Sequence, residues 1–363
     1  MKISFLFGIT TGRWIRLLRE NRFRVALRYL HRALLLTILS LFNSYHYRKE
    51  ERCYHNAIVN NDLEPQPIFI MGHWRSGTTH LHNILNKDPR LATPNTYQVM
   101  FPHTFLTTED TMTVKLASAI PNKRPQDNVP LGWDTPQEDE IAMCMYTPYS
   151  TALSFSFPQR ALTYDRYMSF REVPEVELED WKRSYKYFAQ KLTFKYQCPV
   201  VLKSPLHTCR IKVLLDLFPN ARFIHIVRNP YRVFVSSVYL LEALQRSYFL
   251  LQRPNNIPFS DRVLDTYQLM HEVYFEEVGM IPEGQFHFLR HEDLVKDTMG
   301  EMRKLYETLS LPDFVEFEPA LQEYVESLAG YRKNVYAPMD PTLKENIAAR
   351  WRRNFEEWNY PLD

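Results

Sequence analysis

Two glycines enclose a short stretch that is rich in hydroxyl groups and contains one arginine. Residues 68–79 read IFIMGHWRSGTT, in which Gly72 and Gly77 have the G-x-x-x-x-G spacing of a phosphate-binding loop. Backbone N–H groups at the start of a helix after such a loop bind anions, and the helix dipole adds to the attraction. The sequence therefore predicts an anion site, to which Arg75 adds a fork of donors that stays charged.

The loop lacks the lysine of proteins that bind ATP or GTP with magnesium. Thr78 follows Gly77 at the position where those proteins carry lysine. They also usually end a neighbouring strand with an aspartate that binds magnesium. Here the apolar run 221–227 leads instead into Arg228-Asn229-Pro230. We therefore predict that the loop holds a phosphate without a metal, with hydroxyl donors from Ser76, Thr78 and Thr79. A P-loop kinase is an alternative that the missing lysine disfavours.

A second group of anion-binding residues follows the run 221–227. Pro230 suits the first position of a helix. On that helix Ser236 lies about two turns beyond the strand, so its hydroxyl can join Arg228 around one anion. In the alternative interpretation, Arg228 and Arg232 are solvated surface charges and Ser236 faces solvent.

Together these two motifs resemble the sulfotransferase family that uses 3′-phosphoadenosine 5′-phosphosulfate (PAPS). Residues 75–79, Arg-Ser-Gly-Thr-Thr, are similar to the family's 5′-phosphosulfate loop, and Arg228 with Ser236 is similar to its 3′-phosphate site. Arginine at position 75 is similar to the bacterial sulfotransferase-like and tyrosylprotein branches, because cytosolic small-molecule members usually have lysine there. The resemblance covers roughly residues 65–360 and implies sulfuryl transfer from PAPS to an acceptor hydroxyl, with no metal required.

The resemblance also implies a basic loop near the C-terminus that closes over the nucleotide. Arg332 and Lys333 fall at that place in the sequence. A solvated basic turn is the alternative for both residues.

Sulfuryl transfer needs a cation for the leaving phosphate and a base for the acceptor proton. Lys203 ends the apolar run 199–203, where it can bind the bridging oxygen or the transferring group. It could instead only cap the edge of a sheet. His207 lies four residues further along and is a candidate base, although a histidine at such a position also packs against or caps the next helix.

Three consecutive carboxylates provide the rival base. Residues 136–140, Pro-Gln-Glu-Asp-Glu, resemble a signature of bacterial sulfotransferase-like proteins, and the tyrosylprotein branch uses a glutamate as its base. We therefore rank Glu138 first and Glu140 second as the base. Alternatively, these carboxylates only stabilise the first turn of a helix predicted over 138–145.

The pattern of elements from Pro67 onward indicates where these residues lie. Short apolar runs alternate with helical stretches, as in a parallel α/β sheet. Strands are expected at 68–71, 199–203, 221–227 and 285–289, and helices at 78–86, 208–218 and near 298–309. The predicted fold class is α/β: a P-loop-containing nucleotide-binding fold with a central parallel sheet flanked by helices, plus an N-terminal helical extension. Residues 94–198 and 240–275 are expected to be insertions over the carboxyl ends of the strands, where ligands bind in such sheets.

The N-terminal extension is basic and partly apolar. Within residues 1–50, arginines alternate with apolar residues, and Ala33–Phe42 then contains only two polar residues. That run is about half of the roughly 20 residues that a membrane-spanning helix needs. A basic amphipathic helix can lie at a membrane surface, which is one expectation for residues 1–50. Packing on its own domain or on a second copy in a homodimer is the other. We expect an arm over 1–60 and a sulfotransferase domain over 65–363.

Composition narrows the partners and the compartment. A net charge of +2 among 363 residues does not indicate a nucleic-acid binder. The four cysteines form no C-x-x-C pair, which favours a reducing, cytoplasmic location with peripheral membrane contact at most. Many apolar side chains suggest a hydrophobic acceptor such as a sterol, lipid or phenol: Trp74, Phe101, Phe105, Trp133, Met143, Met145, Tyr146, Tyr149, Phe155 and Phe157. A non-catalytic, membrane-peripheral binding protein is the remaining alternative.

Overall fold

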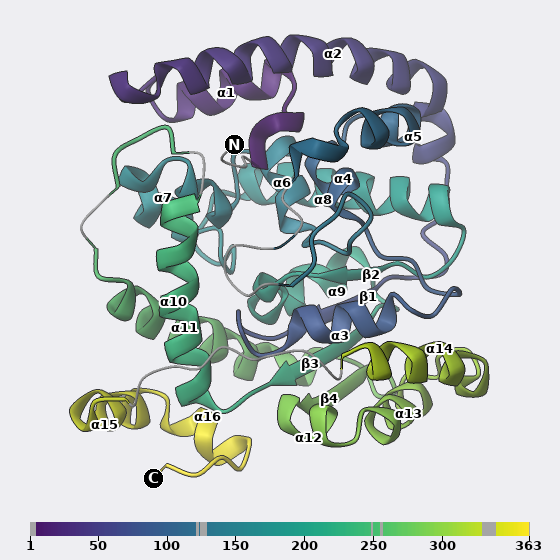
Figure 1. The fold of residues 1–363 in the computed structure, drawn as a ribbon, viewed down its shortest axis with the longest axis vertical. Helices are drawn as coiled ribbons and strands as arrows, with labels where there is room; N and C mark the ends of the chain where they lie inside the picture. The colour runs from purple at the N-terminus through teal and green to yellow at the C-terminus, as the bar shows by residue number, and fades with distance from the viewer. Residues whose placement is uncertain are drawn as a thin grey trace. The chain divides into compact units, whose positions relative to one another are not determined.

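The structure is a computed structural model that describes residues 5–120, 123, 129–247, 250–254, 257–328 and 339–362. Its helices and strands are labelled in Figure 1. The chain forms two compact units, each assembled from separate segments of the sequence. The first comprises Met1–Pro65, Thr93–Val200 and Ala243–Asn256, and the second comprises Gln66–Ala92, Val201–Glu242 and Ile257–Asp363.

A four-stranded parallel sheet forms the centre of the second unit. Its strands are β1 (Ile68–Met71), β2 (Val201–Lys203), β3 (Arg222–Val227) and β4 (Phe286–Arg290), in the order β2-β1-β3-β4. Phe69 lies opposite Leu202 on one side and Phe223 on the other. The sequence prediction of four parallel strands is therefore confirmed, with β2 beginning at Val201 rather than at Pro199.

Alternate residues of these buried strands face two different helical layers. The even-numbered residues of β1 pack with α3 (Thr78–Leu85), α13 (Thr298–Thr308) and α14 (Phe314–Ser327). On the opposite face, Phe69 contacts Phe218, and His225 contacts Tyr274 of α11 (Phe259–Glu277). The period of two along each strand places a helical layer on both faces, as a parallel sheet requires. This arrangement is the α/β fold class that the sequence predicts.

The remaining helices of this unit connect or extend the sheet. They are α9 (Ile211–Leu217), α10 (Pro230–Ser247, which continues into the first unit), α12 (His291–Lys296), α15 (Pro341–Arg350) and α16 (Arg352–Glu357), with a 3₁₀ helix, η6, over Pro205–Cys209. The helix predicted over 208–218 is therefore two elements, because Arg210 between them has the non-helical dihedral angles φ −134° and ψ 20°.

The first unit is helical. Its α-helices are α1 (Thr11–Glu20), α2 (Leu30–Val59), α4 (Thr96–Met100), α5 (Phe105–Lys115), α6 (Glu140–Tyr146), α7 (Ala161–Asp165) and α8 (Glu175–Tyr196). The helix α8 packs against both α2 and α6. The apolar run 33–42 is part of the 30-residue helix α2. Within the described ranges, no helix combines the length and the hydropathy that a membrane crossing needs.

Candidate active site

At two positions of the loop between β1 and α3, the backbone adopts a conformation that favours glycine. Gly72 has a φ of 141° and Gly77 a φ of 110°, both in the left-handed region. A Cβ atom on Gly72 would lie 2.3 Å from the carbonyl oxygen of Ile226, and one on Gly77 would lie 2.5 Å from Nδ1 of His291. The two glycines therefore let the loop fold against β3 and α12, with α3 beginning directly after Gly77.

The side chains of this loop include a hydroxyl group suited to an anion. The Oγ atom of Ser76 is buried and has no hydrogen-bond partner among the described residues. A buried hydroxyl without a partner costs free energy, so a phosphate oxygen that accepts its proton would be favourable here. The N–H of Gly72 instead donates to Oγ1 of Thr208 (2.8 Å), which fixes the start of the loop. The loop therefore fits a phosphate group at the N-terminus of α3.

The structure brings the two predicted anion-binding groups together within the second unit. Nε of Arg75 donates a hydrogen bond to Oγ of Ser236 (2.8 Å). Nη1 of Arg228 donates to the backbone oxygen of Arg75 (3.3 Å). The helix α10 begins at Pro230, as the sequence predicts, and presents Ser236 toward the loop, whereas Arg232 is exposed. Two arginines and one hydroxyl thus form a connected cationic group next to the phosphate loop.

A second set of contacts, which sequence reasoning missed, holds the turn after Arg228. The N–H of Asn229 donates to Oε1 of Glu292 (3.1 Å), and the hydroxyl of Tyr360 donates to Oε2 of the same carboxylate (2.7 Å). Residues 292 and 360 are far from position 229 in the chain, so no local sequence pattern predicts these contacts. Thr208, which binds Gly72, was missed for the same reason.

Lys203 and His207 occupy different environments near the sheet. Lys203 is the last residue of β2, pairs in register with Ile70, and is buried. His207 lies in η6 and is also buried, with its ring edge against Phe69 at 5.1 Å between centroids. Lys203 thus ends the strand beside β1, which leads into the loop. His207 makes the packing contact that the sequence analysis considered as an alternative to catalysis.

His73, a loop residue, is held neutral by burial. Desolvation lowers its pKa to about 4, although the hydrogen bond between Nδ1 and the backbone oxygen of Trp74 opposes that shift. His73 is therefore uncharged near neutral pH, and the positive charge of the loop comes from Arg75.

The three consecutive carboxylates belong to the first unit and differ in their surroundings. Asp139 accepts a hydrogen bond from the hydroxyl of Tyr185, and Glu140 accepts one from Oγ of Ser150 (2.6 Å). Both carboxylates are buried, whereas Glu138 is partly exposed. The helix α6 begins at Glu140 and not at Glu138, so the first two carboxylates precede it.

The apolar side chains that suggested a hydrophobic acceptor are mostly core residues. Buried members of that set are Phe105, Met143, Met145, Tyr146, Tyr149 and Phe157. Their burial is explained by packing within the first unit, so they provide no evidence about the acceptor. Arg332 and Lys333 lie outside the described residues. In the part of the chain that the structure describes, no cluster of three histidine, cysteine or acidic side chains could hold a metal ion.

Comparisons with known proteins identify related sequences and folds. A family model described as "Sulfotransferase family" matches residues 67–316. A protein named omega-hydroxy-beta-dihydromenaquinone-9 sulfotransferase Stf3, from Mycobacterium bovis, is 39% identical over 329 residues, which cover 91% of this chain and 84% of the relative.

Two solved structures have a similar fold. Sulfotransferase STF9 from Mycobacterium avium aligns with a TM-score of 0.69 and 19% identity, over 87% of this chain and 82% of its own. Sulfotransferase STF1 from Mycobacterium tuberculosis aligns with a TM-score of 0.66 and 17% identity, over 95% and 93%.

Proposed function

The chain belongs to the sulfotransferase family and transfers a sulfuryl group from PAPS to an acceptor hydroxyl, and we propose that this acceptor is a hydroxylated lipid of the menaquinone type. The observation that carries the proposal is the relative at 39% identity over 91% of the chain, whose name specifies an omega-hydroxylated dihydromenaquinone. No observation favours the kinase or the non-catalytic binding protein.

For the donor, we propose the residues of the second unit that the hydrogen bonds connect. The loop Arg75, Ser76, Gly77, Thr78 and Thr79 would hold the 5′-phosphosulfate, supported by the buried Oγ of Ser76 and the glycine-dependent backbone. Arg228 and Ser236 would hold the 3′-phosphate. The hydrogen bond between Arg75 and Ser236 would then link the two anion positions, because the Ser236 hydroxyl contacts both Arg75 and the 3′-phosphate.

For the transfer, we propose Glu138 as the base and Lys203 as the cation. Glu138 takes the proton of the acceptor hydroxyl as its oxygen forms a bond to sulfur. The bond between sulfur and the oxygen of the 5′-phosphate breaks, and Lys203 neutralises the charge that develops on 3′,5′-ADP as it leaves. Glu138 is ranked above Glu140 because Glu138 is partly exposed whereas Glu140 is buried, and His207 ranks last because it is packed on Phe69.

Other expectations from the sequence stay predictions. They include the division into an arm (1–60) and a sulfotransferase domain (65–363), the homodimer, the cytoplasmic location, peripheral membrane contact, and nucleotide contacts of Arg332 and Lys333.

The acceptor class can be tested with sulfur-labelled PAPS and pairs of matched acceptors. The full chain is incubated with a menaquinone that carries a terminal hydroxyl and with the same menaquinone without it, beside a sterol, a phenol and a glycan. We expect a labelled, sulfated product from the hydroxylated menaquinone alone, detected by mass spectrometry. Faster transfer to the phenol or the glycan would overturn the proposed acceptor and leave the sulfotransferase activity itself intact.

A further inference from the structure

The helix α2 exposes many apolar side chains and buries several polar ones, beside the buried Leu36 and Ile58. Its buried side chains include Ser40, Asn43 and Glu50. Its exposed side carries an apolar stripe, which we define as Leu34, Leu35, Ile38, Leu41, Phe42 and Tyr45. The exposed fractions of Leu34, Ile38 and Leu41 are 62%, 58% and 59%. A surface helix normally buries its apolar stripe, so these side chains indicate a surface that something else covers.

The orientation of α2 is fixed by hydrogen bonds of its polar side. Nδ2 of Asn43 donates to the backbone oxygens of Phe7 (2.6 Å) and Ile9 (3.0 Å). Glu50 accepts hydrogen bonds from the N–H (2.9 Å) and the hydroxyl (3.0 Å) of Thr107 and pairs with the buried Lys191. Turning the apolar stripe inward would break these bonds and bury unpaired charge. The stripe therefore stays exposed for a structural reason.

Basic residues precede and follow the apolar stripe in the sequence. Between residues 11 and 49 the chain has nine lysine and arginine residues and one acidic residue, Glu20. Exposed members of this basic group are Arg19, Arg22, Arg24, Arg28, Arg48 and Lys49. Pairing two copies of this face would bring the basic groups together and cost electrostatic free energy, whereas an anionic surface would attract them.

Two grooves lie along α2, and the first of them combines apolar and basic side chains. The first has a volume of about 650 Å³ and is lined by residues of α1 and α2, including Arg13, Ile15, Leu41, Tyr45 and Arg48. The two helices contact each other and lie side by side in Figure 1. Apolar side chains and arginines thus line one space, which suits a molecule with an anionic head and an apolar body.

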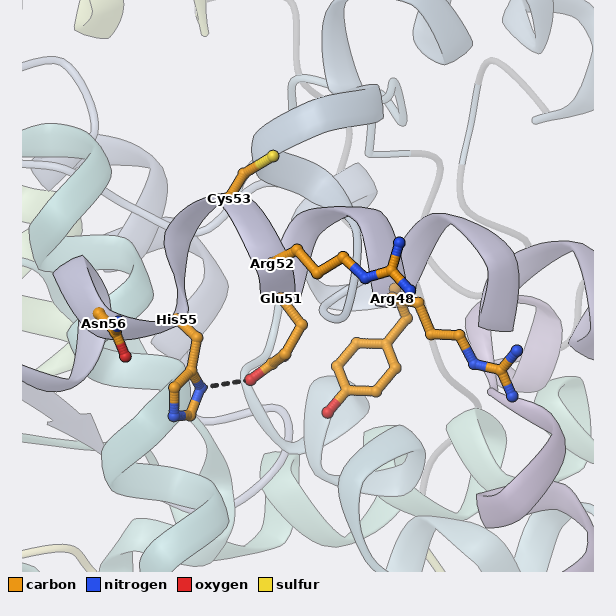
Figure 2. A pocket seen from close by; sticks show the side chains of 7 residues that line it. Arg48, Glu51, Arg52, Cys53, His55 and Asn56 are labelled. Carbon is orange, nitrogen blue, oxygen red and sulfur yellow. Dashed lines mark hydrogen bonds and ion pairs between the residues drawn. The ribbon is translucent and has the colours of Figure 1, made fainter.

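The second groove continues toward the C-terminal part of α2. Its volume is about 490 Å³, and its lining includes Arg48, Glu51, Arg52 and His55. Figure 2 shows Glu51 turned toward His55, while the side chains of Arg48 and Arg52 point away from that pair. Glu51 is therefore paired with His55 and not with either of the two arginines that line the groove.

We propose that the exposed face of α1 and α2 docks on a membrane surface that contains anionic phospholipids. The apolar stripe enters the boundary between headgroups and acyl chains, and the basic group binds the phosphates around it. The helix would lie in the plane of the membrane, because it is held along its length by the first unit. This docking would bring the enzyme to the bilayer in which a lipid acceptor dissolves. The contacts between the protein and the membrane do not depend on which acceptor is used.

Vesicle flotation of the full chain, without PAPS or acceptor, tests the proposal. We compare vesicles of phosphatidylcholine alone with vesicles that contain phosphatidylglycerol as well. We expect at least tenfold tighter binding to the anionic vesicles, weakening at higher salt. The triple variant L34S/I38S/L41S should bind at least tenfold more weakly. A matched variant, V114S/L162S/V176S, removes apolar side chains of α5, α7 and α8 that are even more exposed, and it should bind as the original chain does.

A charge variant and two controls complete the experiment. R24Q/R28Q should weaken binding to anionic vesicles by about fivefold per arginine and leave binding to neutral vesicles unchanged. Retained binding of 3′,5′-ADP shows that each variant is folded. Equal binding by L34S/I38S/L41S and the matched variant would overturn the proposal. The proposal would also be overturned if sedimentation showed that the original chain is a dimer and that L34S/I38S/L41S is a monomer. A second copy of the chain would then cover the apolar stripe.

Discussion

Replacing Arg228 with alanine should weaken the binding of 3′,5′-ADP by about 10- to 50-fold and leave 5′-AMP almost unaffected. A hydrogen bond to a charged group contributes roughly 1.5–3 kcal/mol, and each 1.4 kcal/mol corresponds to a factor of ten in affinity. Because Arg228 is partly exposed, solvent screens its charge, and we expect the lower part of that range. The two nucleotides differ in the 3′-phosphate, so their comparison isolates the group that Arg228 is proposed to bind.

Calorimetry of the full chain with each nucleotide, in buffer without magnesium, measures this difference. Arg232→Ala is the matched control, since this arginine is exposed and lies four residues after Arg228, in the first turn of α10. Its effect on 3′,5′-ADP should be less than about twofold, as expected for a screened surface charge.

Two results would refute the reasoning about Arg228. Equal weakening of 5′-AMP and 3′,5′-ADP would mean that Arg228 acts through its hydrogen bond to the backbone of Arg75, by holding the loop. Equal effects of the two arginine substitutions would mean that the nucleotide responds only to overall charge.

Three further changes test other parts of the structure. Glu138→Gln should lower kcat by roughly 100-fold or more with KM for PAPS unchanged, whereas Glu140→Gln should mainly lower the melting temperature. Unchanged turnover in Glu138→Gln would contradict the assignment of Glu138 as the base. Tyr185→Phe removes the hydrogen bond to the buried Asp139 and should cost about 1–3 kcal/mol in urea unfolding, and a loss below about 0.5 kcal/mol would contradict that contact. Burial lowers the pKa of His225 to about 3, so the unfolded chain binds the proton first and the free energy of unfolding falls as the pH drops below about 6.5. Between pH 7 and 5, His225→Phe should make this fall in the free energy of unfolding smaller by about 2 kcal/mol. An unaltered pH profile of stability would argue against the burial of His225.

Local patterns in the sequence were enough to predict the elements that carry the proposed donor site. The strand β1, the loop with Gly72 and Gly77, and the helix α3 follow one another within 18 residues of chain, Ile68–Leu85. Each is specified by its own residues: an apolar run, two glycines that permit a left-handed backbone, and a helix-forming stretch. The start of α10 at Pro230 was predicted for the same reason, because proline fixes the dihedral angle of the first helical turn.

Interactions between distant segments were outside the reach of such patterns. The bond between Arg75 and Ser236 joins residues 161 positions apart, and the support of Asn229 by Glu292 spans 63. The apolar set between Trp74 and Phe157 was interpreted as an acceptor site, yet most of it packs in a core. Composition alone cannot separate these two roles, since both favour the same residue types.

The sequence by itself determined the sheet, the glycine loop and the presence of two cationic groups, because these depend on residues that are neighbours in the chain. It also showed that residues 1–50 are basic and apolar. Only the tertiary structure decided which side of α2 is buried, since Asn43 and Glu50 find their partners on segments far away in the sequence. Satisfying those buried polar groups turns Leu34, Leu35 and Leu41 outward, and the same constraint leaves the apolar stripe exposed.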